Sequence, residues 1–202
     1  MNIFDLFFSV LLSRKLLERN FAYQYVREFF AHGYSQYPIF YTMSIRNVIL
    51  VSGRIGSGKS NTIARIYLRL CQKQSRHSFN GIDVSTPQIP SLPIESDFYA
   101  IFESINNVKI GMISAGDYKE DFLHIFRKIR NKVDVLICAS RLIDNDDSVF
   151  RYITTDLFNE GVSVDLNFGT FPTHTDNARQ NMQDSIVNAV MQHLDNAYFN
   201  NQ

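Results

Sequence analysis

The sequence has no tryptophan, only two cysteines and no excess of either charge, and each shortage argues against a class of protein. Twenty Lys and Arg residues balance twenty Asp and Glu residues, so no bulk positive charge favours nucleic acid or an anionic membrane as a partner. Neither Cys71 nor Cys138 has a Cys or His at metal-ligand spacing, and the five histidines form no zinc-binding pattern. We therefore expect two buried, reduced thiols and a cytoplasmic location.

Long apolar runs are also scarce. The apolar run at residues 3–12 has about half the length of a membrane span, and Asp5 interrupts it. Its neighbouring positive charges follow the run, whereas those of a signal peptide precede it. We therefore expect no transmembrane segment in this protein.

Residues 1–42 differ in their sequence pattern from the α/β domain expected after them. Apolar residues recur at helical spacing between Leu12 and Phe30, which predicts a helical N-terminal appendage of one or two amphipathic helices. Three interpretations stay open: packing on the domain that follows, docking to a membrane surface or partner, or a segment that function does not require. Under the last interpretation, Met43 is a natural start of the protein.

Residues 53–60, Gly-Arg-Ile-Gly-Ser-Gly-Lys-Ser, match the phosphate-loop pattern G-x-x-x-x-G-K-[ST] at every fixed position. The glycines keep the bends open, so that successive backbone N–H groups can surround a polyphosphate. Lys59 places an ammonium on the terminal phosphates, and Ser60 offers a hydroxyl to phosphate-bound Mg²⁺. The expected nucleotide-binding residues are Gly53, Arg54, Ile55, Gly56, Ser57, Gly58, Lys59, Ser60 and Asn61.

The flanking sequence supplies the strand and the helix that this motif requires. Residues 48–51 are an apolar run rich in β-branched side chains, and Ile63, Ile66 or Tyr67, and Leu70 follow at helical spacing. The alternative is a glycine-rich turn that binds nothing. This alternative does not explain why the complete motif stands between a strand pattern and a helix pattern. With motif and context together, the chain resembles the P-loop NTPase superfamily, which implies ATP and Mg²⁺ as ligands.

Apolar patterns alternate between helix and strand over the rest of the chain. We expect helices at 98–105 (with Ser96 as cap), 118–130, 148–159 and 177–198, and strands at 109–114, 133–139 and 162–168. Between these and the first helix, residues 74–96 are the longest irregular stretch, with a short strand at 82–84. The alternation predicts an α/β fold over residues 43–202, of the three-layer α/β/α kind seen in P-loop NTPases, with a mainly parallel sheet.

Ligands of open α/β sheets bind beyond the carboxyl ends of the strands, and this rule selects the candidate acid. Asp117 follows the strand at 109–114 and, by resemblance to the Walker B acid, is the candidate metal ligand beside Ser60. The alternative is structural, because Asp117 and Glu120 also fit a helix-capping box.

The same rule selects Arg141, which follows the strand at 133–139. Together with Lys59, Arg141 is a candidate catalytic residue that stabilises transition-state charge. The alternative for Arg141 is a surface ion pair with Asp144 or Asp146.

Two functions are consistent with these residues. The first is Mg²⁺-dependent ATP hydrolysis or kinase-like transfer of the γ-phosphoryl group to an unknown small molecule. The second is a nucleotide-dependent switch with little turnover, whose loop at 74–96 orders on nucleotide binding and docks a protein partner. Guanine is the less favoured base, because the chain has no Asn-Lys-x-Asp sequence.

Overall fold

The computed structural model describes residues 44–88, 96–105, 107–142, 148–172 and 175–199. The predicted helical appendage at 1–42 and the possible start at Met43 lie outside these residues. Asp144 and Asp146, the alternative partners of Arg141, also lie outside them.

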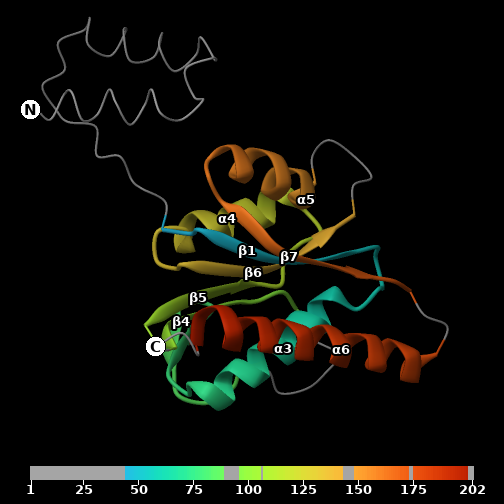
Figure 1. Cartoon of the computed structure of the whole chain (residues 1–202), viewed down its shortest axis with the longest axis horizontal. Coiled ribbons are helices and arrows are strands. Elements are labelled where there is room, and N and C mark those ends of the chain that lie inside the picture. Colours follow the sequence, from blue (N-terminus) through green and yellow to red (C-terminus); the bar gives the residue numbers. More distant parts are fainter. Residues whose placement is uncertain (1–43, 89–95, 106, 143–147, 173–174, 200–202) are drawn as a thin grey trace, which may run out of the picture. The chain divides into compact units, whose positions relative to one another are not determined.

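Among the described residues, seven strands form one sheet in the order β3-β2-β4-β5-β6-β1-β7 (Figure 1). The strands are β1 (Asn47–Gly53), β2 (His77–Phe79), β3 (Ile82–Val84), β4 (Tyr99–Ile105), β5 (Val108–Ile113), β6 (Val135–Arg141) and β7 (Ser163–Thr170). Strands β5, β6, β1 and β7 are parallel, whereas β3, β2 and β4 join them through antiparallel pairs. The sheet is therefore mixed, and the prediction of a mainly parallel sheet holds only for its β5-to-β7 half.

Helices cover both faces of the sheet (Figure 1). Helices α3 (Lys59–Lys73) and α6 (Asp176–Leu194) pack on one face, and α6 continues into the π-helical turn η3 (Asp195–Phe199). The other face carries α4 (Lys119–Ile129) and α5 (Val149–Arg151), which continues into the π-helix η2 (Tyr152–Leu157). Each face has its own apolar core, so the predicted α/β class with helices on both sides is confirmed.

Strand β1 is apolar at successive positions because both of its faces are buried. Val48 and Leu50 pack in the core under α4 and α5, and Ile49 and Val51 pack in the core under α3 and α6. All four side chains are fully buried, which contributes roughly 1.5–3 kcal/mol each. With β6 on one side and β7 on the other, β1 is a rigid support for the phosphate loop, residues 53–60.

The segment at 98–105 is strand β4 rather than the predicted helix. Phe98, Ile101, Phe102 and Ile105 have helical spacing, but the same spacing arises in a strand that is buried on both faces. Phe98 and Phe102 pack on the α3 side of the sheet, and Ile101 packs on the α4 side. Short apolar runs of this kind do not distinguish a helix from a buried strand.

The stretch at 74–96, which we expected to be irregular, contains the hairpin of β2 and β3, so its predicted short strand is confirmed. The hairpin turns at Asn80 and Gly81, which have positive φ angles of 49° and 85°. Asn-Gly is the preferred pair for such a turn, and this sequence signal could have located the hairpin.

A buried polar cluster joins α3 to β2. The hydroxyl of Tyr67 lies 2.6 Å from Nε2 of His77, and Nδ1 of His77 lies 2.7 Å from the carbonyl oxygen of Ser75. Because a carbonyl can only accept, Nδ1 carries the proton of a neutral ring and Nε2 accepts from Tyr67. Burial lowers the pKa of His77, so the folded protein favours the neutral imidazole.

We expect the stability of the protein to fall as the pH drops below about 6.5, the ordinary pKa of histidine. The pKa of His77 is lower in the folded than in the unfolded chain, so the unfolded chain takes up the proton first. The loss is at most about 1.4 kcal/mol per pH unit. Urea denaturation between pH 7.5 and 5 should show a flatter dependence for His77→Gln than for the wild type. The exposed His124 offers the control His124→Gln, and equal slopes for all three proteins would contradict the prediction.

Candidate functional site

The phosphate loop connects the end of β1 to the start of α3, as the motif predicts. Gly56 and Gly58 have φ angles of 74° and 86°, which favour glycine. At Gly53 the reason is space, because a Cβ would lie 2.0 Å from Oγ1 and 2.7 Å from the carbonyl oxygen of Thr170. The loop is therefore exposed at Gly56, half-buried at Gly58 beside the amide of Gln183, and packed tightly where it leaves β1.

Residues far away in sequence hold the loop in shape. The hydroxyl of Ser57 lies 2.7 Å from that of Thr170, which donates to the carbonyl oxygen of Ser52. From α6, the amide of the buried Gln183 donates to the carbonyl oxygen of Gly58 at 3.4 Å. Sequence reasoning missed Thr170 and Gln183, and a glutamine among the inward-facing positions of the last helix was the available signal.

Lys59 places a nearly buried ammonium at the start of α3. Its side chain is 6% exposed, and Nζ lies 3.2 Å from the carbonyl oxygen of Arg54 and 3.4 Å from Oδ1 of Asp117. Removing an ammonium from water is costly, and oxygen partners at hydrogen-bond distance offset that cost. The phosphate loop thus carries a fixed positive charge at the point where the motif requires one.

The structure brings Asp117 and Arg141 together beside Lys59, as their positions after β5 and β6 predicted. Nε of Arg141 lies 3.1 Å from Oδ1 of Asp117, the same oxygen that Lys59 approaches. Partial burial favours protonated Asp117, but the ion pair with Arg141 and the charge of Lys59 outweigh it and hold the pKa of Asp117 below its ordinary value. The ion pair with Asp117 raises the pKa of Arg141 in turn. One carboxylate therefore lies between two cations.

The capping interpretation of Asp117 is wrong. The cap position of α4 belongs to Tyr118, and no side chain donates or accepts a capping hydrogen bond there. The ring of Tyr118 instead lies under the guanidinium of Arg141, 5.1 Å from ring centroid to Cζ. The carboxylate of Asp117 points to the cations, and its role as a metal ligand stays a prediction.

Asp97 is an acid of this region that sequence reasoning missed. It precedes β4, and because β4 runs antiparallel to β5, the start of β4 lies at the edge where the parallel strands end. The hydroxyl of Ser114 donates to Oδ1 of Asp97 at 3.1 Å. Desolvation and, less strongly, the charges of Asp117 and Asp121 raise the pKa of Asp97 against this hydrogen bond. The expectation of a helix at 98–105 concealed its position.

The donor atoms suit an Mg²⁺ ion that arrives with a nucleotide. Such an ion needs one or two protein oxygens, because phosphate oxygens and water complete its octahedron. Ser60, in the first turn of α3, and Asp117 supply oxygens of this kind. Among the residues that the structure describes, no three His, Cys, Asp or Glu side chains could hold a metal ion by themselves.

Comparisons with family models, curated proteins and solved structures find no match to this chain. The resemblance to P-loop NTPases therefore depends on the motif at residues 53–60 and on its flanking elements. Within the described ranges, no helix combines the length and the apolar character that crossing a bilayer requires.

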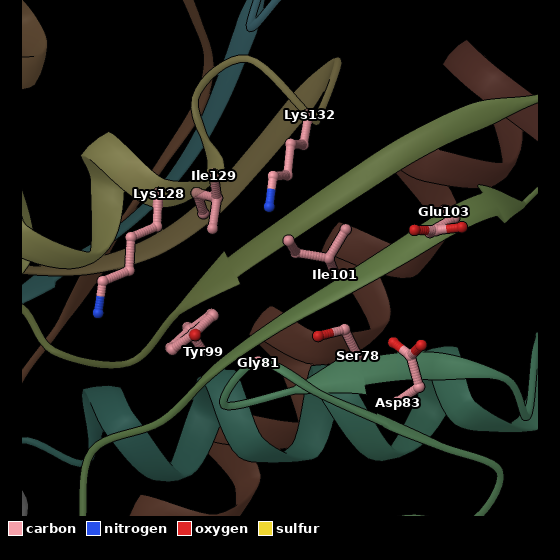
Figure 2. A pocket seen from close by; sticks show the side chains of 9 residues that line it. All are labelled: Ser78, Gly81, Asp83, Tyr99, Ile101, Glu103, Lys128, Ile129 and Lys132. Carbon is pink, nitrogen blue, oxygen red and sulfur yellow. The ribbon is translucent and has the colours of Figure 1, made fainter.

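A hollow away from the phosphate loop lies between β4, the β2–β3 hairpin and the end of α4 (Figure 2). It has a volume of about 190 Å³ and is lined by Ser78, Gly81, Asp83, Tyr99, Ile101, Glu103, Lys128, Ile129 and Lys132. Its walls carry opposite charges, with Asp83 and Glu103 on the strands, Lys128 in the last turn of α4 and Lys132 in the turn that follows (Figure 2). Small-molecule sites typically measure about 300–1,000 Å³, so the hollow is small for a nucleotide. None of the expected nucleotide-binding residues lines it.

Proposed function

We propose that this protein binds ATP with Mg²⁺ in the loop at residues 53–61 and transfers the γ-phosphoryl group to a small molecule or to water. One observation carries the proposal: the buried ammonium of Lys59, the carboxylate of Asp117 and the guanidinium of Arg141 meet beside the phosphate loop. The start of α3, where no side chain caps the helix, adds its N–H groups and its positive dipole end to the same place. Together these groups form a site for a polyanion with one acid next to it.

Each side chain has a role that follows from its present partners. Lys59 and Arg141 share Asp117, and both exchange this carboxylate for phosphate oxygens when a triphosphate enters. The carboxylate of Asp117 is then available to bind Mg²⁺, for which Ser60 supplies the second protein oxygen. Bound Mg²⁺ would neutralise the phosphate oxygens. Lys59 and Arg141 stabilise the charge that develops on the transferred group, so catalysis consists of positioning and electrostatic stabilisation.

A turnover assay with ATP and Mg²⁺ tests this function. We expect phosphate release, or a phosphorylated product of shifted mass when candidate acceptors are supplied. Tight nucleotide binding without turnover would favour the switch or accessory protein instead. If the protein binds neither ATP nor tripolyphosphate, both functions are wrong.

Asp117→Asn is expected to remove most of the gain in ATP affinity that Mg²⁺ provides. The same change should raise the affinity for Mg²⁺-free ATP by up to about fivefold, because a half-exposed ion pair no longer competes for Lys59 and Arg141. Isothermal titration calorimetry with and without Mg²⁺ measures both effects. Asp121→Asn changes a nearby exposed acid and serves as the control. Identical binding of the two variants under both conditions would rule out the metal role of Asp117.

A further inference from the structure

We infer that the base of the nucleotide stacks on Phe171 and that Arg179 binds the phosphate chain from the α6 side. This inference rests on the proposed function and extends it, because it names where the base lies. Three features of the described residues lead to the inference: the path across the sheet, the exposed ring of Phe171 and the weakly paired guanidinium of Arg179.

The path follows from the strand order. Strands β6 and β7 lie on opposite sides of β1, which carries the phosphate loop. Lys59, Asp117 and Arg141 meet on the β6 side, so the reacting end of a triphosphate lies there. A nucleotide that crosses the loop away from this end reaches the end of β7. The residues after β7 are therefore placed to meet its base.

Phe171 follows β7 directly beside the phosphate loop. The preceding residue, Thr170, contacts Ser57 through its hydroxyl, and its carbonyl oxygen lies 2.7 Å from where a Cβ of Gly53 would be. The N–H of Phe171 donates to Sδ of Met182 on α6, so its backbone is anchored. Phe171 is nevertheless 63% exposed. The ring packs over Gly169, with its Cζ 3.4 Å from where a Cβ of Gly169 would be, one residue beyond the strand end that contacts the phosphate loop. An anchored, exposed aromatic ring in this position is a surface on which a base can stack.

Arg179 approaches the same loop from α6. It lies three and four residues before Met182 and Gln183, so the three side chains share one face of the helix. Gln183 bonds the carbonyl oxygen of Gly58, and Cδ of Arg179 is 3.7 Å from where a Cβ of Gly58 would be. Arg179 thus lies next to the phosphate loop, on the helix face from which Met182 accepts the N–H of Phe171.

The guanidinium of Arg179 is only weakly engaged. Its Nη1 lies 3.5 Å from Oδ1 of Asp176, whose side chain is 97% exposed, and such ion pairs contribute little. Its Nε is buried and has no hydrogen-bond partner among the described residues. Phosphate oxygens or a ribose hydroxyl would satisfy this donor, which otherwise carries a desolvation cost.

A stacked aromatic ring contacts the face of a base and makes no hydrogen bond to the edge of the base. Every base has such a face, and purines offer the larger one. We therefore expect ATP and GTP to bind within a few-fold of each other, and both to bind more tightly than tripolyphosphate.

Calorimetry with ATP and with tripolyphosphate tests the inference. Phe171→Ala should weaken ATP binding about tenfold and leave tripolyphosphate binding unchanged, because only ATP has a base to stack. Phe158→Ala is the matched control, since Phe158 is 62% exposed and is the C-cap residue of η2. Arg179→Ala should weaken the binding of both ligands.

Three outcomes would overturn the inference. The first is equal ATP binding by Phe171→Ala and Phe158→Ala. The second is an equal loss of ATP and tripolyphosphate binding in Phe171→Ala. The third is binding of both ligands by Arg179→Ala as tight as that of the wild type. In each of these cases the proposed function survives, provided that the wild type binds both ligands. A wild type that binds neither ligand contradicts the proposed function itself, and the two failures are therefore distinct. Melting temperatures of the variants check that they fold.

Discussion

Lys59→Ala is expected to weaken ATP binding about a hundredfold and to abolish turnover. The ammonium of Lys59 is the one charge that the phosphate loop itself holds in a nearly buried position, with Asp117 and a backbone carbonyl as its partners. Charge-assisted hydrogen bonds to phosphate contribute about 1.5–3 kcal/mol, and each 1.4 kcal/mol is a factor of ten in affinity. Calorimetry with ATP and Mg²⁺ measures the loss, and phosphate release measures the turnover.

Lys73→Ala at the other end of α3 is the control for Lys59→Ala. Lys73 pairs with Asp195 and is about one-third exposed, so its loss should leave ATP binding unchanged. Lys59→Ala is expected to fold, because Arg141 still pairs with Asp117 when Lys59 is removed. Its melting temperature checks this expectation. If Lys59→Ala folds and still binds ATP as the wild type does, the phosphate site has been assigned to the wrong loop.

Gly116→Ala is expected to lower the free energy of unfolding by about 3 kcal/mol. A Cβ at this position would lie 2.2 Å from the carbonyl oxygen of Ala139 and 2.8 Å from the amide nitrogen of Ser140. These are backbone atoms of β6, which cannot move aside as a flexible side chain can. The turn would have to lift away from β6 and carry Asp117 away from Arg141, so ATP binding should fall as well. Chemical denaturation and calorimetry measure the two effects.

Gly161→Ala separates crowding from backbone strain. Gly161 has a φ of 92°, but no atom lies within 4 Å of where its Cβ would be. Alanine there should cost only about 1 kcal/mol, from the left-handed conformation alone. An equally mild effect at Gly116 would mean that the turn after β5 does not rest on the backbone of β6.

The parallel half of the sheet and the phosphate loop were predictable because their sequence signals are local. Residues 48–51 are apolar on both faces, the glycines of the motif have fixed spacing, and the alternating pattern at 162–168 correctly placed β7 at the sheet edge. The rule that ligands bind beyond the carboxyl ends of strands also brought Asp117 and Arg141 to Lys59.

The antiparallel half was not predictable in the same way. Strand β4 has apolar residues on both faces, and nothing in that pattern states that it runs against β5. The wrong expectation of a helix hid Asp97 in turn, because an acid before a strand reaches the site only if that strand is reversed. Thr170, Gln183 and Arg179 reach the loop through the packing of β7 and α6, which no motif encodes.

The position of β1 between β6 and β7 has a consequence for how the chain matures during synthesis. The β2–β3 and β4–β5 pairs join neighbouring segments and can form early, whereas β1 waits for partners that emerge much later. A nascent chain that ends before Ser163 lacks the strand that closes the far side of β1. Thr170 and Gln183, which brace the loop, emerge later still. The proposed triphosphate site is therefore complete only after α6 has emerged, so nucleotide binding by a nascent chain would report that α6 has been made.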